Sequence, residues 1–381
     1  MVPRMILSQI MANLYKGKAI IMLGPRQTGK TTLLNMLEKE LNEKPLWLDC
    51  DETDVRKRLT DTTSTQLKNL IGNNKTVFID EAQRVTNIGL TIKLFTDKLK
   101  DVQLVVTGSS SLELANKINE PLTGRKFEFI ICPLSFAELS NVNGILEENR
   151  MLEHRLIYGY YPDVVVNNGS EELILKNLSS SYLYKDIFNL QEVRKPEVIE
   201  RLLEALALQL GSEVSFNELT QIVQADQETI QKYINLLEQS YVIFRLRSFS
   251  RNQRNELKKS RKIYFYDNGI RNAILRTYSP IETRSDKGAL WENFLISERY
   301  KIQQIYQKSV KTWFWRTKLQ QEIDYIEEEN NVLNAFEFKW SPKKTAFISK
   351  TFRDTYPNHV FQVINRENYS DFVTKHDFVR L

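Results

Sequence analysis

The feature that most constrains this chain is an octapeptide, Gly-Pro-Arg-Gln-Thr-Gly-Lys-Thr, which runs from Gly24 to Thr31. The apolar run 19–23 before it predicts a strand, and the segment after it predicts a helix. A G-x-x-x-x-G-K-[ST] pattern between a strand and a helix is typical of a phosphate-binding loop. The sequence therefore predicts a binding site for a nucleoside triphosphate.

The chemistry of phosphate binding explains the residue types in this loop. Gly24 and Gly29 let backbone N–H groups turn toward a phosphate, and the helix that begins here directs its positive end at the anion. We expect the amino group of Lys30 to reach the outer phosphates and the hydroxyl of Thr31 to bind Mg²⁺. The expected nucleotide contacts are Gly24, Pro25, Arg26, Gln27, Thr28, Gly29, Lys30, Thr31 and Thr32.

Composition sets the broad class. The 381 residues are enough for about two to four domains, and the hydrophobic and charged fractions, 41% and 27%, are those of an ordinary soluble protein. Apolar runs of about five residues are too short to span a membrane, and two cysteines are too few for a disulfide framework. We expect a cytoplasmic protein with no membrane partner.

A second strand supplies the acidic residues that a nucleotide-hydrolysing site needs. The apolar segment 76–79 leads directly into Asp80 and Glu81. We expect Asp80 to hold the metal, directly or through water, and Glu81 to polarise the attacking water. A buried strand that ends in an acidic turn without a ligand is the alternative interpretation.

Two further residues are candidates for the same site. Ser109 follows the apolar segment 103–107, where ATPases with an extra strand place a polar residue near the γ-phosphate; a helix cap is the alternative role. Arg125 precedes the apolar segment 127–131 and is a candidate arginine finger, with an ordinary surface arginine as the alternative. The sequence leaves open whether Arg125 would serve its own nucleotide or that of a neighbour in an oligomer.

Apolar segments alternate with helical stretches in the N-terminal part. This alternation predicts an α/β fold in which a parallel sheet is covered by helices on both faces. Nucleotide would lie at the carboxyl ends of the strands, where we expect the candidate residues to fall. The expected strands are 18–23, 46–49, 75–80, 103–107 and 127–131.

With these residues in place, the N-terminal part resembles the bacterial and archaeal AAA+-type ATPases whose P-loop reads Gly-Pro-Arg-Gln-x-Gly-Lys-Thr-Thr-Leu. The resemblance implies that the chain binds ATP with Mg²⁺ and hydrolyses it, but it does not define what the ATP is used for. Matching motifs lie at 24–33, 80–84, 107–110, 124–125, 133–138, 159–162 and 262–269. The motifs at 159–162 and 262–269 belong to a C-terminal domain of unknown function that usually accompanies this ATPase.

Four regions are expected along the chain. They are an ATPase domain at 1–138, a helical lid or linker at 139–210, a winged helix at 211–275 and an α/β nuclease-like domain at 280–381. An apolar stripe between Val198 and Leu210 predicts a core-facing helix in the second region. In the third, helices at 216–223 and after Asp226 precede strands at 241–249 and 263–266, an order typical of a winged helix.

The expected wing is strongly basic. Eight basic residues and one acid lie between Arg245 and Lys262, which favours contact with the phosphates of DNA. A solvated loop or a protein-binding surface is the alternative interpretation. The candidate DNA-contacting residues are Arg251, Arg254, Lys258, Lys259 and Arg261.

The C-terminal region predicts three short strands, 313–316, 322–326 and 332–339. Folding them as neighbours brings Asp324, Glu337 and Lys339 together, and an upstream helix adds Glu292. This set resembles the PD-(D/E)XK nuclease core, although no proline precedes Asp324. The resemblance implies that Asp324 and Glu337 bind one or two Mg²⁺ ions, that Lys339 orients water or stabilises charge, and that Glu292 is an outer ligand. An exposed Glu-Lys pair is the alternative.

Three functions remain open at this point. The first is an ATPase that couples hydrolysis to conformational work on DNA. The second is a nuclease whose C-terminal site is licensed by ATP. The third is a switch in which nucleotide changes the binding of a protein partner.

Overall fold

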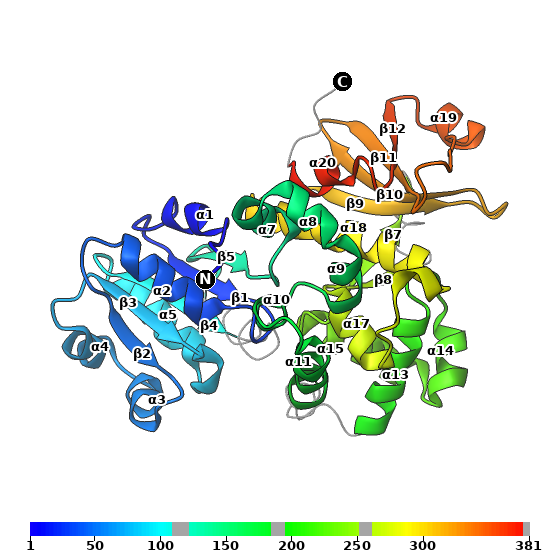
Figure 1. The fold of residues 1–381 in the computed structure, drawn as a ribbon. Coiled ribbons are helices and arrows are strands. Elements are labelled where there is room, and N and C mark those ends of the chain that lie inside the picture. Colours follow the sequence, from blue (N-terminus) through cyan, green and yellow to red (C-terminus); the bar gives the residue numbers. More distant parts are fainter. Residues whose placement is uncertain (109–121, 184–194, 251–260, 376–381) are drawn as a thin grey trace. The chain divides into compact units, whose positions relative to one another are not determined.

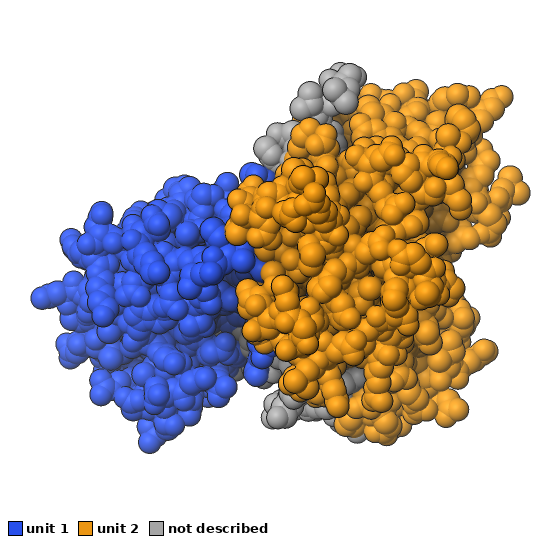
Figure 2. Space-filling model, viewed as in Figure 1, with its two compact units in different colours: residues 1–134, 239–241, 304–307 blue, residues 135–238, 242–303, 308–381 orange. Residues whose placement is uncertain are grey.

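The computed structural model describes residues 1–108, 122–183, 195–250 and 261–375 (Figure 1), apart from the side chains of 181–183. The chain divides into two compact units (Figure 2). Unit 1 comprises 1–134, 239–241 and 304–307, and unit 2 comprises 135–238, 242–303 and 308–381. Within the described ranges, no helix has the length and apolar character needed to cross a membrane.

Unit 1 is built on a parallel sheet of five strands in the order β2-β3-β4-β1-β5. Strands β1, β3 and β4 are buried along their whole length, as expected for the centre of a covered parallel sheet. The predicted α/β fold class and its five strands are confirmed. The strands are β1 (Ala19–Leu23), β2 (Leu46–Asp49), β3 (Thr76–Asp80), β4 (Gln103–Gly108) and β5 (Lys126–Ile130).

Helices flank this sheet (Figure 1). Helix α2 begins at the last residues of the phosphate-binding loop, and α4 begins with a capping box between Thr63 and Gln66. The helices of unit 1 are α1 (Leu7–Met11), α2 (Lys30–Glu40), α3 (Thr53–Leu59), α4 (Ser64–Ile71), the short 3₁₀ turn η1 (Ala82–Arg84) and α5 (Ile88–Lys98).

Unit 2 contains a mixed sheet of seven strands in the order β12-β11-β10-β9-β7-β8-β6. Strands β9, β10 and β11 form an antiparallel meander, and β12 joins β11 in parallel. Strand β7 also pairs with β9 in parallel, so the hairpin β7–β8 belongs to the same sheet. The strands are β6 (Glu213–Val214), β7 (Ile243–Ser248), β8 (Arg261–Phe265), β9 (Lys311–Arg316), β10 (Glu322–Glu329), β11 (Val332–Phe338) and β12 (His359–Ile364).

Helices make up most of the rest of unit 2. The apolar stripe predicted in the second region is buried on α13, as expected for a core-facing helix. The helices are α7 (Phe136–Asn143), α8 (Ile145–Arg150), α9 (Leu152–Tyr158), α10 (Pro162–Val166), α11 (Glu171–Asn177), η2 (Leu178–Leu183), α13 (Pro196–Leu208), α14 (Phe216–Val223), α15 (Gln227–Gln239), α17 (Asn268–Leu275), η3 (Ile281–Thr283), α18 (Lys287–Ile305), α19 (Lys350–Thr355) and α20 (Tyr369–Thr374).

Two motifs that are distant in the sequence meet in unit 2. The carboxylate of Asp267 accepts the N–H of Tyr160 at 2.7 Å and caps α17 through the N–H of Ile270 at 3.2 Å. A Cβ on Gly159, where φ is +75°, would lie 2.0 Å from the Oδ1 atom of Asp267. Only glycine fits this close approach, so the motifs 159–162 and 262–269 form one packed unit.

An acidic residue just before α18 neutralises two buried arginines. Oδ2 of Asp286 accepts from Nη1 of Arg271 at 2.6 Å and from Nη2 of Arg284 at 2.8 Å. Partial burial alone would raise the pKa of Asp286, but the hydrogen bonds and charges of the two arginines outweigh burial and lower it to about 2.

We expect Asp286→Asn to lower the free energy of unfolding by about 1–3 kcal/mol at neutral pH, because two buried arginines lose a charged partner. The folded-state pKa lies below the ordinary value of 3.8, so this stabilisation is present above that value and is lost as the pH falls toward 2. Denaturant titrations at neutral and acidic pH should show the gap between wild type and variant narrowing on acidification. A gap of constant size would contradict the assignment, and Asp371→Asn, on an exposed ion pair, is the control.

Candidate functional site

The phosphate-binding loop joins β1 to α2. Gly24 has a φ of +150°, and a Cβ there would lie 2.3 Å from the carbonyl oxygen of Ile131, a distance that only glycine allows. Nζ of Lys30 donates to the carbonyl oxygens of Gly24 at 3.0 Å and Pro25 at 2.7 Å. The lysine therefore lies inside the loop, 5% exposed, where phosphate oxygens would compete with neutral carbonyls for its amino group.

Thr31 and Asp80, which the sequence analysis took from separate motifs, are in contact. Oγ1 of Thr31 donates to Oδ2 of Asp80 at 2.7 Å. Strand β4 lies between β1 and β3 and adds Thr107, whose hydroxyl donates to Oδ1 of the same carboxylate. Mg²⁺ prefers oxygen ligands such as carboxylates and hydroxyls, so these residues fit a magnesium ion bound with a nucleotide.

Glu81 occupies a left-handed backbone conformation, with φ at 51°, which is uncommon for a residue other than glycine. Its backbone N–H donates to Oδ1 of Asp80 at 3.1 Å and to Oγ1 of Thr107 at 3.2 Å. Its carboxylate accepts from Nε2 of Gln83 at 2.6 Å. Hydrogen bonds on both the backbone and the side chain therefore fix the direction of the Glu81 carboxylate.

Arg4 braces the loop from the N-terminal segment. Nη1 of Arg4 donates to the carbonyl oxygen of Thr28 at 2.7 Å, and Nη2 donates to that of Cys132 at 2.8 Å. These bonds tie the loop, just before Gly29, to the segment that follows β5. No sequence motif surrounds Arg4, so nothing in the sequence marks it. Thr107 was not predicted either, because the serines that follow β4 are the more obvious polar candidates.

Arg125 lies at the amino ends of the parallel strands, whereas the loop follows their carboxyl ends. Strands β1 and β5 are parallel, and the N–H of Ala19, at the start of β1, donates to the carbonyl oxygen of Arg125 at 3.0 Å. The loop follows the other end of β1, roughly 15 Å away at the usual rise per residue. The expectation that all candidates fall at the carboxyl ends is therefore wrong for Arg125, whose Nε pairs with Asp97 at 2.6 Å.

Because of this position, Arg125 lies away from the phosphate-binding loop of its own chain. A role as an arginine finger toward a neighbouring copy stays a prediction. Ser109, the other candidate from the sequence, lies outside the described residues.

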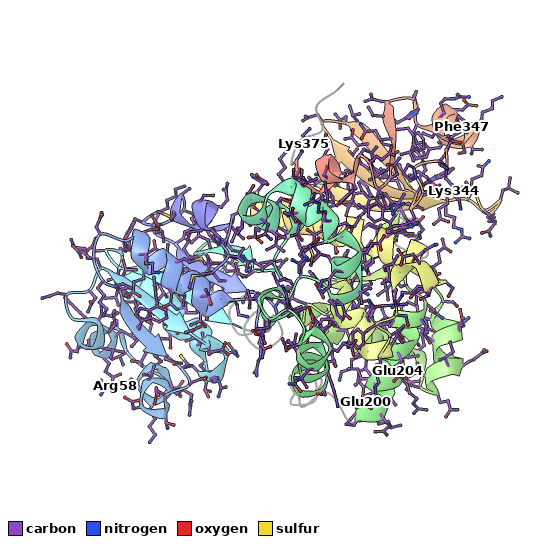
Figure 3. The ribbon with its side chains drawn as sticks, in the orientation of Figure 1. Arg58, Glu200, Glu204, Lys344, Phe347 and Lys375 are labelled. Carbon is purple, nitrogen blue, oxygen red and sulfur yellow. The ribbon has the colours of Figure 1, made fainter. Side chains whose placement is uncertain are left out.

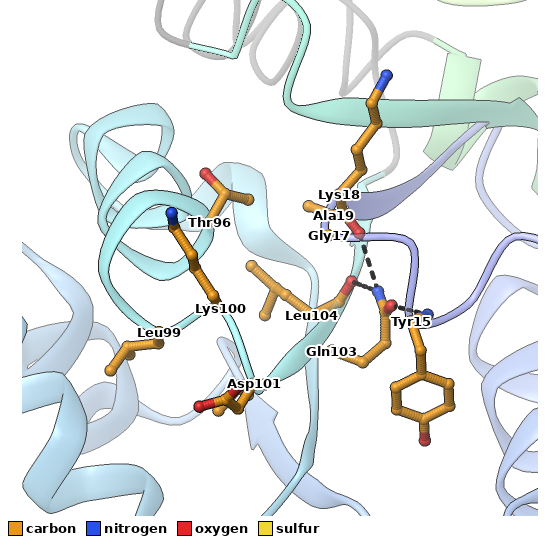
Figure 4. Close-up of a pocket in the computed structure, with 11 residues that line it drawn as sticks. Tyr15, Gly17, Lys18, Ala19, Thr96, Leu99, Lys100, Asp101, Gln103 and Leu104 are labelled. Atoms are coloured by element: carbon orange, nitrogen blue, oxygen red, sulfur yellow. Dashed lines mark hydrogen bonds between the residues drawn. The ribbon is translucent and has the colours of Figure 1, made fainter.

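A cavity of about 250 Å³ opens near this amino edge (Figure 4). The amide of Gln103 bridges the strands beside it, since Nε2 donates to the carbonyl oxygens of Lys18 at 3.1 Å and Leu104 at 2.8 Å. The cavity lies at the amino ends of β1 and β4, whereas nucleotides bind at the carboxyl ends of parallel strands. We therefore do not assign it to the nucleotide site.

We call the hairpin of β7 and β8, with the segment 249–260 that connects them, the basic hairpin. The structure describes this hairpin only up to residue 250 and again from residue 261. Arg261 begins β8 directly opposite Arg247 of β7, and its guanidinium lies 5.1 Å from the ring of Phe216 on α14. Burial lowers the pKa of Arg261, and the charges of Arg245 and Arg247 lower it further. Like charges directly opposite one another are unfavourable, and an anion bound here would relieve them. Arg251, Arg254, Lys258 and Lys259 lie outside the described residues.

The structure brings the candidate residues of the C-terminal region into one environment. Oδ2 of Asp324 on β10 accepts the N–H of Phe338 at 2.7 Å, and Oε1 of Glu337 accepts from Nζ of Lys339 at 2.6 Å. Burial raises the pKa of Asp324 well above its ordinary value, and the charges of Glu292 and Glu337 raise it further. These carboxylates are therefore close enough to repel one another.

Two residues of β8 that the sequence analysis did not select complete this cluster. Nζ of Lys262 lies 2.9 Å from Oε1 of Glu292 and 2.6 Å from Oε1 of Glu322. The hydroxyl of Tyr264 donates to Oε1 of Glu292 at 2.6 Å. Strand alternation places Lys262 and Tyr264 on one face, which was the available signal, but the sequence analysis counted Lys262 with the basic wing.

Three regions of the chain match known protein families. Residues 16–140 match a family described as an AAA domain. Residues 149–280 match a domain of unknown function, DUF8612, and residues 287–379 match another, DUF4143. Residues 16–140 are therefore similar to AAA-type domains, and the two later regions are similar to domains whose function is not known.

Similar curated proteins are themselves uncharacterised. One from Mycobacterium tuberculosis is 24% identical over 345 residues, which cover 89% of this chain and 74% of that protein. One from Methanocaldococcus jannaschii is 24% identical over 306 residues, which cover 75% and 67%. One from Haemophilus influenzae is 26% identical over 204 residues, which cover 51% and 49%.

Among solved structures, a DNA polymerase III gamma subunit-related protein of Thermotoga maritima aligns with 12% identity and a TM-score of 0.25, over 61% of this chain and 98% of that one. Drosophila ORC bound to AT-rich DNA and Cdc6 aligns with 10% identity and a TM-score of 0.24, over 71% and 88%. At these scores neither likeness bears on function.

We expect Gly24→Ala to destabilise unit 1 by at least about 2 kcal/mol more than Gly17→Ala, because the new Cβ overlaps backbone that cannot move aside freely. Gly17 is the matched control, since it also has a positive φ, +71°, but no atom lies within 4 Å of the Cβ position. Thermal unfolding of the two variants checks this prediction. Equal losses of stability would show that the loop does not approach Ile131 as described.

Proposed function

We propose that this chain binds ATP with Mg²⁺, hydrolyses it, and uses the nucleotide state to control binding or remodelling of DNA. The observation that carries the ATPase proposal is the contact between Thr31 and Asp80, whose side-chain oxygens lie 2.7 Å apart although the residues belong to separate motifs. The match of residues 16–140 to an AAA domain supports it.

The residues of the loop suit the binding of the phosphates. Lys30 and the N–H groups at the start of α2 would bind the outer phosphates. Thr31 and Asp80 would hold Mg²⁺, which offsets the charge that develops as the bond between the γ-phosphorus and the ADP oxygen breaks. Thr107 orients Asp80 by donating to Oδ1, the oxygen that Thr31 does not contact.

Glu81 is our candidate for activation of the water. Its carboxylate would accept a proton from the water whose oxygen attacks the γ-phosphorus, and ADP and phosphate would then leave. The hydrogen bond from Gln83, at 2.6 Å, keeps this carboxylate in one orientation. A fixed carboxylate next to the metal-binding residues is what such a step requires.

Basic and polar side chains of unit 2 support the DNA part of the proposal. Arg247 and Arg261 face each other at the base of a hairpin whose loop carries further basic residues. On α15, the side chains of Gln227, Gln231 and Lys232 are exposed. A helix with polar side chains beside a basic hairpin is suited to the groove and the phosphates of DNA.

We also propose finer assignments for the regions after 1–138. The order α14, α15, β7 and β8 supports a winged helix at 211–275, and 139–210 would serve as a lid or linker. Helix α18, the meander β9–β11, α19 and the parallel β12 support a nuclease-like core at 280–381. The position of Lys262 between Glu292 and Glu322 argues against metal-dependent cleavage by this core.

Loss of Lys30 or Asp80 should abolish ATP turnover. We expect Lys30→Ala and Asp80→Ala to lower the rate by at least about 10²-fold, because each removes a group that stabilises charge on the phosphates. Thr107→Val should lower it by about 10-fold, since only the orientation of Asp80 is lost. Steady-state phosphate release measures these rates. Arg58→Ala, an exposed residue on α3 (Figure 3), is the control, and undiminished hydrolysis in Asp80→Ala would refute the site.

Charge reversal in the basic hairpin should separate DNA binding from ATP hydrolysis. We expect Arg254→Glu with Lys258→Glu to lower DNA affinity by at least about 10-fold at low salt and to flatten its salt dependence, because phosphate contacts release counterions. Stimulation of ATP turnover by DNA should fall in parallel, while basal turnover stays unchanged. Lys57→Glu with Arg58→Glu on α3 is the control, because it changes the net charge of the protein by the same amount. Absence of DNA binding by the wild type at low salt would favour a switch that binds a protein partner.

A further inference from the structure

Acidic residues of the C-terminal strands and of α18 lie near a buried lysine. We call Glu292, Glu322, Asp324 and Glu337 the acidic cluster. In a metal-dependent nuclease, carboxylates in such an arrangement hold Mg²⁺. Here Nζ of Lys262 lies 2.9 Å from Glu292 and 2.6 Å from Glu322, and Lys262 also interacts electrostatically with Asp324. A positive group is therefore already present between carboxylates from different elements.

One oxygen of Glu292 is occupied by two protein donors. Oε1 accepts hydrogen bonds from Nζ of Lys262 at 2.9 Å and from the hydroxyl of Tyr264 at 2.6 Å. Oε2 faces Gly211, where even a Cβ would approach it to 3.3 Å. The side chain is only 15% exposed. Glu292 thus directs Oε1 at two protein donors, in a site that is largely closed to solvent.

The other carboxylates have protein partners as well. Oδ2 of Asp324 accepts the N–H of Phe338 at 2.7 Å, and Oε1 of Glu337 accepts from Lys339 at 2.6 Å. Nε of Arg316 lies 3.7 Å from Oε2 of Glu322. Across the described part of the chain, no group of three or more His, Cys, Asp or Glu side chains is arranged to hold a metal ion.

Lys262 is itself fixed in the core of unit 2. It is 2% exposed, and its Nζ lies 5.4 Å from the centre of the Phe314 ring. Its backbone belongs to β8, which pairs with both β7 and β6. Withdrawing the ammonium would leave carboxylates without a cation in a buried environment, which is strongly unfavourable. The residues present therefore do not fit a divalent metal while Lys262 is in place.

We propose that Lys262 is the resident cation of the acidic cluster: its ammonium group takes the place of a divalent metal, so the C-terminal domain is not a metal-dependent nuclease. This inference is independent of the proposed ATPase, since every residue that carries it lies in unit 2. A nuclease-like fold can therefore be present without nuclease chemistry, because the fold of a domain does not determine its activity.

Titration with Mn²⁺ followed by electron paramagnetic resonance, without nucleotide, tests the proposal on the full-length protein. Wild type and Asp324→Asn should bind the same number of Mn²⁺ ions per chain, because the cluster holds none. Lys262→Ala should gain one Mn²⁺ ion, and the double variant Lys262→Ala with Asp324→Asn should lose it again. Lys344→Ala, an exposed lysine of the same domain (Figure 3), should behave like the wild type.

Two outcomes would overturn the proposal. One is a wild-type protein that binds at least one Mn²⁺ ion more than Asp324→Asn. The other is a folded Lys262→Ala that gains no Mn²⁺ ion, because Lys262 would then not be what excludes the metal. If Lys262→Ala does not fold, the comparison of wild type with Asp324→Asn decides alone. Plasmid DNA incubated with wild type and Mn²⁺ should stay intact, and cleavage abolished by Asp324→Asn would also refute the inference.

Discussion

The contact of Asp80 with Thr31 and Thr107 is the interaction on which the nucleotide site depends. It joins the end of β3 to the start of α2 and to the end of β4. Because the strands are parallel, their carboxyl ends meet at one edge of the sheet. Strand β4 lies between β1 and β3, so the hydroxyl of Thr107, near the end of this strand, reaches the carboxylate from the side. The chemistry of the site therefore follows from the order of the strands.

Much of unit 1 could be predicted from the sequence because its signals are local. Five apolar runs each predict a strand, and Lys30, Thr31, Asp80 and Glu81 lie in short motifs at the ends of two of them. Positions that depend on pairing between distant segments could not be predicted. Arg4 reaches the loop from outside any motif. Arg125, in contrast, could have been placed correctly, because a residue that precedes a strand of a parallel sheet falls at the amino ends of the strands.

Unit 2 shows the same limit more clearly. Nothing in the sequence indicates that β7 pairs with β9 and thereby joins the basic hairpin to the C-terminal strands in one sheet. That pairing explains why Lys262, at the base of the hairpin, lies among carboxylates of α18 and β10. Gly159 and Asp267 belong to two separate sequence motifs, and the structure shows that these motifs pack against each other.

The contrast between Lys30 and Lys262 explains how two buried lysines in one chain can have different roles. Both are almost inaccessible, 5% and 2% exposed. Lys30 donates to neutral carbonyl oxygens, and a phosphate would be a stronger partner because its full negative charge attracts the ammonium group. Lys262 already lies between two carboxylates, so an incoming anion would meet negative charge and an incoming metal would meet a competing cation. Burial alone does not distinguish a ligand-binding lysine from a structural one; the charge of its existing partners does.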